Sequence, residues 1–429
     1  MRHYLPMAIM GIRHRVALHP YQPRPWTMVW TMAVAQVISW GTLFYAFSLF
    51  VVPMQESLGW SRPLLHGALS LGLLSTGVVA LPVGAWIDRH GGRSVMTLGS
   101  LAGGLLLLAW AQVETPWVFY LLWVLIGVSM AGVLYEPAFA VITATFGPDY
   151  RRGITALTLV GGFASTVFMP VTQYLITALG WRNALLVLGG LNLAVCLPLH
   201  ALFVPGSAAS RSPEVPPEFR STAPALRTIL HGQVFWGLAI WFAAYGAAQS
   251  ALIFQFVPLL TTWGIETSVI LASVALIGPM QVAGRVVLMC FSTHLETKEI
   301  GMAVMVLLPT ALLTLLLLPH TLLWLGVAAT LYGAGNGIMT IVRGIAVADL
   351  LGRDYYGALN GALTTPTTVA KALAPVGAAA VWSATGDPSM MLWVILTSAL
   401  LSTVGFVLAL SGTSRSMTRA VPLDIGGGR

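Results

Sequence analysis

Residues 63–87 read PLLHGALSLGLLSTGVVALPVGAWI, and the chain continues as Asp88-Arg89-His90-Gly91-Gly92-Arg93. The first stretch contains no Asp, Glu, Lys or Arg. It is long enough for a helix through the core of a bilayer, because such a helix needs about 20 apolar residues. The second stretch is short, charged and rich in glycine. Together the two predict a membrane-spanning helix that ends in a tight polar turn.

The rest of the chain has the same composition as this segment. Of its 429 residues, 57% are hydrophobic and 8% are charged, whereas a soluble protein carries about 25% charged residues. This deficit excludes a water-soluble enzyme and a disordered protein. The apolar runs are continuous rather than alternating, which argues against a transmembrane β-barrel. We therefore expect an all-α membrane protein.

Twelve helices of spanning length are predicted, six on each side of a polar, proline-rich break. They cover residues 27–52, 63–87, 95–113, 116–146, 153–179 and 182–204, then 233–262, 267–291, 299–319, 321–350, 355–384 and 388–411. The predicted organisation is a basic tail (1–26), a six-helix bundle (27–204), a central loop (205–232), a second six-helix bundle (233–411) and a second tail (412–429).

An internal repeat supports this division. At an offset of 205 residues, one short pattern occurs twice, as Gly147, Asp149 and Tyr150 and again as Gly352, Asp354 and Tyr355. Both copies fall in equivalent loops, which favours two parallel six-helix pseudo-repeats.

The positive charges predict how the chain is oriented. Sixteen of the 21 Lys and Arg residues fall in segments on the side of the N-terminus, and two, Arg62 and Arg182, fall on the other side. Cytoplasmic loops collect Lys and Arg, so we expect a multi-pass protein of the bacterial inner membrane with both termini cytoplasmic. The net charge of +7 then reflects topology, and no nucleic-acid partner is expected. The basic N-terminal stretch lacks a long apolar run and does not read as a signal peptide.

The segment from Gly84 to Arg93 resembles the signature loop of the major facilitator superfamily, G-x-x-x-D-R-x-G-R-R, one residue short at its end. The resemblance implies the twelve-helix major facilitator fold and a gating role for Gly84, Asp88, Arg89, Gly91 and Arg93. Asp88 can cap the following helix or pair with arginines on neighbouring helix ends. The equivalent loop of the second half, 292–296, lacks the Asp-Arg pair, so we expect an asymmetric latch.

Two further stretches narrow the resemblance. Leu58-Gly59-Trp60-Ser61-Arg62 and Gly180-Trp181-Arg182 are similar to segments of bacterial members of the monocarboxylate transporter and oxalate–formate antiporter branch. In that branch an arginine on helix 8 and a lysine on helix 11 face the central cavity and bind carboxylate. Arg285 and Lys371 stand at these places, so the resemblance implies that they bind the substrate.

Four ionisable residues lie well inside predicted spans: Glu136, Arg285, Arg343 and Lys371. Each costs about 2.5–3.5 kcal/mol on insertion scales. Three are basic, so an anionic substrate is the simplest compensation. The alternatives are that the cations reach an interface or backbone carbonyls, and that Arg343 pairs with Asp349 or lipid phosphate. Glu136 is a candidate for proton coupling, or else a structural partner of a basic residue such as Arg343.

Amide and aromatic side chains complete the predicted cavity, although each aromatic is more often a packing residue. The candidates are Gln36, Trp40, Tyr45, Tyr245, Gln249, Gln281 and Asn336. By analogy with the fold, helices 1, 4, 7 and 10 line the pathway. The sequence contains no Walker loop, metal cluster or nucleophile triad, so we expect no cofactor, no metal and no enzyme activity.

The sequence therefore predicts a secondary active transporter for a small organic anion, a monocarboxylate first and a dicarboxylate second. It would work as a monomer by alternating access, with proton symport or anion exchange. The alternative is a proton-driven multidrug or metabolite exporter of the same superfamily. A membrane receptor is disfavoured because the short loops leave no room for a signalling domain.

Overall fold

The computed structural model describes residues 25–206, 223–291 and 295–420. Within these residues the chain forms helices and connecting turns, with no strand. Most of the predicted N-terminal tail and of the predicted central loop falls outside them, as do residues 292–294 of the loop equivalent to the Asp88 loop and residues 421–429 of the predicted second tail. The end of the predicted central loop forms a short helix, α11 (Ala223–Leu230).

The N-terminal half consists of six helical paths, four of which are interrupted. They are α1 (Pro25–Trp40), η1 (Gly41–Tyr45) and α2 (Phe47–Leu58); α3 (Arg62–His90); α4 (Arg93–Trp110); α5 (Pro116–Val133) and α6 (Tyr135–Thr145); η2 (Gly147–Asp149), α7 (Tyr150–Gly161) and α8 (Ala164–Leu179); and α9 (Trp181–Leu191), η3 (Asn192–Cys196) and α10 (Leu197–Phe203).

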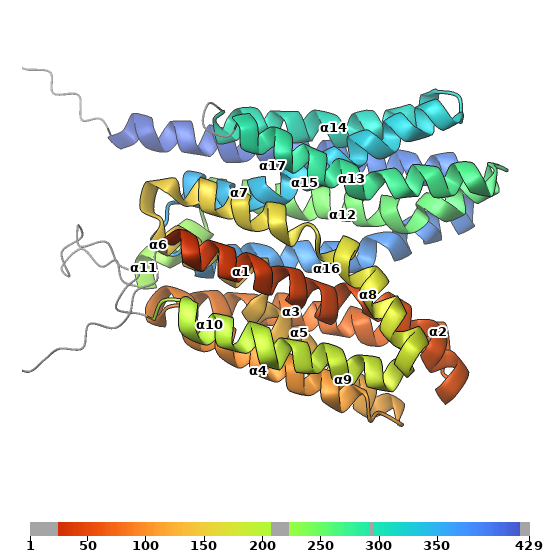
Figure 1. The fold of residues 1–429 in the computed structure, drawn as a ribbon. Helices are drawn as coiled ribbons and strands as arrows, with labels where there is room; N and C mark the ends of the chain where they lie inside the picture. The colour runs from red at the N-terminus through yellow and green to blue at the C-terminus, as the bar shows by residue number, and fades with distance from the viewer. Residues whose placement is uncertain (1–24, 207–222, 292–294, 421–429) are drawn as a thin grey trace, which may run out of the picture.

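The C-terminal half consists of six continuous helices. They are α12 (Gln233–Thr262), α13 (Thr267–Phe291), α14 (Thr297–Leu317), α15 (Leu322–Leu351), α16 (Tyr356–Thr385) and α17 (Pro388–Ala420). The start of α1, the helix α11 and the end of α17 lie at the same end of the bundle (Figure 1).

Eleven of the twelve paths are long and apolar enough to cross a membrane. The twelfth, α16, is also long, at 30 residues, but Lys371 and a run of threonines make it more polar. It packs between α3 and α12. All twelve predicted spans therefore correspond to helices of spanning length. The main differences are at two ends, since α2 continues to Leu58 and α17 to Ala420.

The middle of the N-terminal half has irregular backbone. The fourth path breaks at Leu134, whose φ of −79° and ψ of −157° are not helical. Pro137 follows, and it has no N–H to extend the hydrogen-bond ladder back across the break. The amide nitrogen of Gln36 donates to the carbonyl of Val133, which Pro137 leaves without its helical partner, at 2.7 Å, and to that of Leu134 at 3.2 Å. Transporters place their substrate sites at interruptions of this kind.

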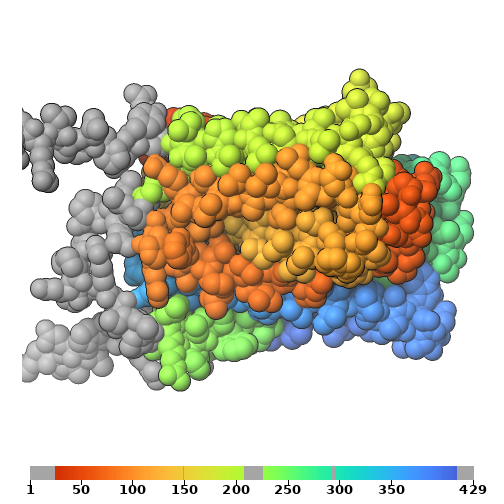
Figure 2. Space-filling model, turned by 90° about the horizontal axis from the view of Figure 1, so that it is seen from below, coloured from red at the N-terminus to blue at the C-terminus, as the bar shows by residue number. Residues whose placement is uncertain are grey.

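The two halves meet mainly near one end of the bundle. This end carries Arg89, Arg93, Arg151, Arg152 and Arg353, and we call it the basic end. The main contacts between the halves join α3, α6 and α7 to α13, α15 and α16. Seen from the side of the N-terminal half, α3 to α5 (orange) and α9 and α10 (yellow-green) form the surface, and green and blue residues of the C-terminal half show along the lower edge (Figure 2).

Candidate functional site

Asp88 connects the two halves at the basic end. Its carboxylate oxygens accept hydrogen bonds from the backbone N–H groups of Gly357 and Ala358, both at 2.8 Å. These N–H groups belong to the first turn of α16, where the helix dipole favours a negative charge. The predicted alternatives were a cap on the following helix or a bond to an arginine. The carboxylate instead caps a helix of the opposite half.

Small residues permit this close approach. A Cβ added at Gly84 would lie 1.9 Å from the carbonyl oxygen of Gly357, so α3 and α16 touch through their backbones. Gly91 ends α3 with a φ of 78°, a conformation that favours glycine. Arg93 turns away from the interface, and its Nε donates to the carbonyl of Val204 at 2.7 Å.

A second junction at the basic end was not predicted from the sequence. Asp349 of α15 accepts hydrogen bonds from Arg151 and Tyr150 of α7 and from Thr297 of α14. Arg151 also donates to the hydroxyl of Thr297 at 2.9 Å. The repeated Gly-x-Asp-Tyr pattern includes Tyr150 but neither Asp349 nor Thr297, so it did not indicate this junction.

Glu136 and Arg343 form an ion pair between the halves. The distance from Glu136 Oε1 to an Arg343 guanidinium nitrogen is 3.3 Å, and both side chains are partly exposed. The same guanidinium nitrogen donates to the hydroxyl of Thr364 at 2.8 Å. Of the alternatives left open by the sequence, Arg343 thus pairs with Glu136 rather than with Asp349.

Arg285 is a buried cation at the boundary between the halves, only 5% exposed. Its guanidinium donates to the carbonyls of Gly337 at 3.4 Å and Thr158 at 3.3 Å, both long contacts. Among the described residues, no Asp or Glu oxygen lies within 4.0 Å of it. A Cβ at Gly162 would lie 1.8 Å from Nη1 of Arg285, so the guanidinium occupies space that a glycine leaves open.

Lys371 lies on the other side of the C-terminal half. Its side chain runs along α12, where a Cβ at Gly246 would lie 2.9 Å from Lys371 Cε. The side chain is exposed, and both charges of the Glu136–Arg343 pair are within electrostatic range of it. Within the described part of the chain it has no carboxylate partner inside 4.0 Å. Lys371 therefore faces an open space rather than a salt bridge.

Aromatic side chains stand close to Arg285. The ring centroids of Trp40 and Tyr135 are 5.1 Å apart, and those of Trp40 and Tyr45 are 6.0 Å apart. Tyr45 and Tyr135 both lie within electrostatic range of Arg285. Tyr135 is the residue of this group that the sequence did not single out, although it stands next to Glu136 at the break in the fourth path.

The other predicted cavity residues divide into two groups. Gln36 is fully buried and donates to the carbonyls at the Leu134 break. Tyr245 is 4% exposed, and its hydroxyl is directed at Gly335 of α15. Both lie in the packed interior of their halves. The side chains of Gln249, Gln281 and Asn336 are partly exposed, as expected for residues along an open pathway.

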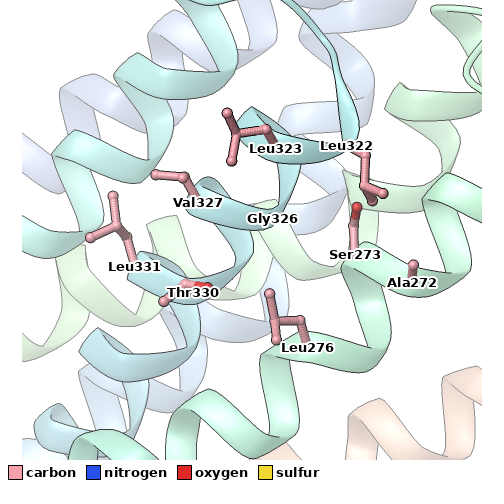
Figure 3. Close-up of a pocket in the computed structure, with 9 residues that line it drawn as sticks. All are labelled: Ala272, Ser273, Leu276, Leu322, Leu323, Gly326, Val327, Thr330 and Leu331. Carbon is pink, nitrogen blue, oxygen red and sulfur yellow. The ribbon is translucent and has the colours of Figure 1, made fainter.

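One distinct hollow lies away from these residues. It has a volume of about 400 Å³ and lies between the first turns of α13 and α15, at the end opposite the basic end (Figure 3). Leu276, Leu323 and Val327 make its walls apolar, and Ser273 and Thr330 add two hydroxyls (Figure 3). Ser273 donates to the carbonyl of Val269 at 2.8 Å. This hollow contains none of the predicted site residues.

Comparison with known proteins agrees with the architecture. A family model described as Major Facilitator Superfamily matches residues 30–375. A gallate transporter of Pseudomonas putida is 28% identical over 37% of this chain and 35% of its own length. Human monocarboxylate transporter 14 is 29% identical over 42% of this chain and 36% of its own length. The chain spans about half or less of the length of the curated relatives it matches.

Solved structures show the same fold. The crystal structure of the transporter FucP in its outward conformation superposes with a TM-score of 0.70, at 14% identity, and covers 91% of this chain and 99% of that one. The chain is thus a multi-pass membrane transporter and not an enzyme, and it belongs to the Major Facilitator Superfamily.

Proposed function

We propose that this transporter moves a small organic anion across the bacterial inner membrane by alternating access, a monocarboxylate first and a dicarboxylate second. The observation that carries the proposal is Arg285. Its side chain is nearly inaccessible, and its hydrogen bonds to the described residues are two long ones to carbonyls. A buried charge without a counter-ion is unfavourable, and a bound carboxylate would supply one in the bidentate geometry that arginine prefers.

Lys371 adds a second positive charge in the same half. Its ammonium group lies on an exposed side chain against α12, so it can attract an anion or hold the second carboxylate of a dianion. The names of two relatives, the gallate transporter and the monocarboxylate transporter, also point to carboxylates. Gln249, Gln281 and Asn336 would offer hydrogen bonds along the pathway.

The contacts at the basic end support a gating role for the Asp88 loop. With this end in the cytoplasm, as the Lys and Arg distribution predicts, the structure corresponds to a state closed toward the cytoplasm. Opening it requires the Asp88 bonds to α16, the Asp349 junction and the Glu136–Arg343 pair to separate.

The Glu136–Arg343 pair also supports a coupling mechanism. A proton on Glu136 would cancel the attraction that holds Arg343 across the boundary, and it would leave the site more positive for an anion. Proton symport and anion exchange differ in whether this protonation takes part in the transport cycle.

Uptake into proteoliposomes tests the proposal. We expect uptake of monocarboxylates, and its loss in Arg285→Gln and Lys371→Gln. Arg152→Gln is the matched control, because Arg152 is 58% exposed in a surface pair with Asp149 and its loss should leave uptake intact. A parent protein that ignores every carboxylate but moves lipophilic drugs in a pH gradient would favour the multidrug-exporter alternative.

A further inference from the structure

Five aromatic rings form a continuous wall from the first helical path to the fourth. In spatial order they are Phe44, Tyr45, Trp40, Tyr135 and Phe139. The centroid distances between successive rings in this order are 5.2, 6.0, 5.1 and 5.4 Å. The wall stands where the helices are irregular, at η1 and at the break before α6.

The central rings of the wall pack against the core on one side but are not fully buried. Trp40, Tyr45 and Tyr135 are partly exposed, whereas Trp110 and Trp123 in the core of the same half are fully buried. In the described part of the chain, the hydroxyls of Tyr45 and Tyr135 have no hydrogen-bond partner, and neither is sealed from solvent. This surface therefore offers, beside partly exposed rings, two hydroxyl groups without a partner among the described residues.

The wall and Arg285 meet at one point. A Cβ at Gly161 would lie 2.7 Å from the hydroxyl of Tyr135, and a Cβ at Gly162 would lie 1.8 Å from Nη1 of Arg285. Because Gly161 is the last residue of α7 and Gly162 follows it directly, the hydroxyl and the guanidinium lie against neighbouring residues of the same helix end. A group that binds the guanidinium therefore also reaches the edge of the aromatic wall.

We propose that the anion taken by this site is an aromatic monocarboxylate. Its carboxylate binds Arg285 and accepts a hydrogen bond from the Tyr135 hydroxyl, and its ring lies on the faces of Trp40 and Tyr45. This proposal rests on the proposed function and adds the substrate class. A short aliphatic acid would leave the wall uncovered, and a saturated ring lacks the π face for offset stacking.

The test compares benzoate with cyclohexanecarboxylate, which share the charge, the carboxylate and the six-carbon ring. Binding to the purified full-length protein is measured by thermal stabilisation, with sodium chloride as the ionic-strength control. We expect benzoate to bind roughly five- to tenfold more tightly, as aromatic stacking allows. Trp40→Leu should remove this preference. Trp30→Leu, on the same helix but 51% exposed at the surface, should keep it.

The outcomes separate the two proposals. If both acids bind equally well to the parent and both depend on Arg285, the aromatic class is wrong and anion transport stands. If neither acid nor any other carboxylate binds, both proposals are overturned. Because the comparison of the two acids is made on the parent protein, it holds even if Trp40→Leu does not fold.

Discussion

Replacing Asp88 by Asn should weaken the closed state of the basic end. The carboxylate accepts two N–H groups, from Gly357 and Ala358, each at 2.8 Å. Asparagine has one acceptor oxygen, and its NH₂ group would face the second N–H. The variant therefore loses one bond outright and the negative charge that strengthens the other.

The size of the effect follows from these two bonds. A hydrogen bond to a charged group contributes about 1.5–3 kcal/mol, and a charge at a helix N-terminus adds about 0.3–1 kcal/mol. Taking a net loss of about 2 kcal/mol, the equilibrium constant for closure falls roughly 30-fold, since 1.4 kcal/mol is tenfold. A shift of this size changes populations visibly unless closure is overwhelmingly favoured at the start.

Distance measurement between two spin labels reports this shift. Labels on cysteines at Arg152 of α7 and Lys298 of α14 span the two halves at the basic end, and both positions are exposed. Asp88→Asn should add or enlarge a longer-distance population. Asp354→Asn is the control, because it removes an exposed carboxylate from the same end. Identical distance distributions in the parent and Asp88→Asn would refute the latch.

Three further changes test other parts of the account. Gly162→Ala places a methyl group where the Arg285 guanidinium lies. It should lower carboxylate affinity at least about tenfold without changing the charge of the site. In the same thermal-shift titration, the control Gly278→Ala should leave the affinity unchanged, because its Cβ meets no atom within 4 Å. Glu136→Gln should abolish uptake driven by a pH gradient while anion exchange persists, and gradient-driven uptake at the parent rate would exclude Glu136 from coupling. Asp349→Asn should lengthen the same spin-label distance, and an unaltered distribution would show that this junction does not hold the halves together.

The helices were predictable because the residues within each helix and the turns beside it determine its position. Uninterrupted apolar runs and polar, glycine-rich turns set the spans, and most ends of the twelve helices agree within a few residues. The interruptions were not predictable in the same way. Pro137 indicated a weakened helical turn in the fourth path. No residue type in η1 or η3 indicates in the same way that the helix forms a π turn there. These irregularities arise from packing, as the bonds from Gln36 to the carbonyls at the Leu134 break illustrate.

The pairing of charges depends on how the halves face each other, which no local pattern encodes. The sequence identified the four ionisable residues inside the spans, and it left open whether Arg343 pairs with Asp349 or Glu136. The relative orientation of α6 and α15 in the folded protein places Arg343 beside Glu136. For the same reason the Asp349–Arg151 junction was missed, since its partners lie 198 positions apart.

The central claim is that Arg285 holds the carboxylate of the substrate. The most direct test titrates one transported monocarboxylate into four purified proteins: the parent, Arg285→Gln, Arg285→Lys and Arg152→Gln. We predict that Arg285→Gln shows no thermal stabilisation, that Arg285→Lys is strongly weakened because it keeps the charge but loses the planar fork, and that Arg152→Gln matches the parent. Stabilisation of Arg285→Gln equal to that of the parent, at the same concentrations of the acid, would contradict the claim.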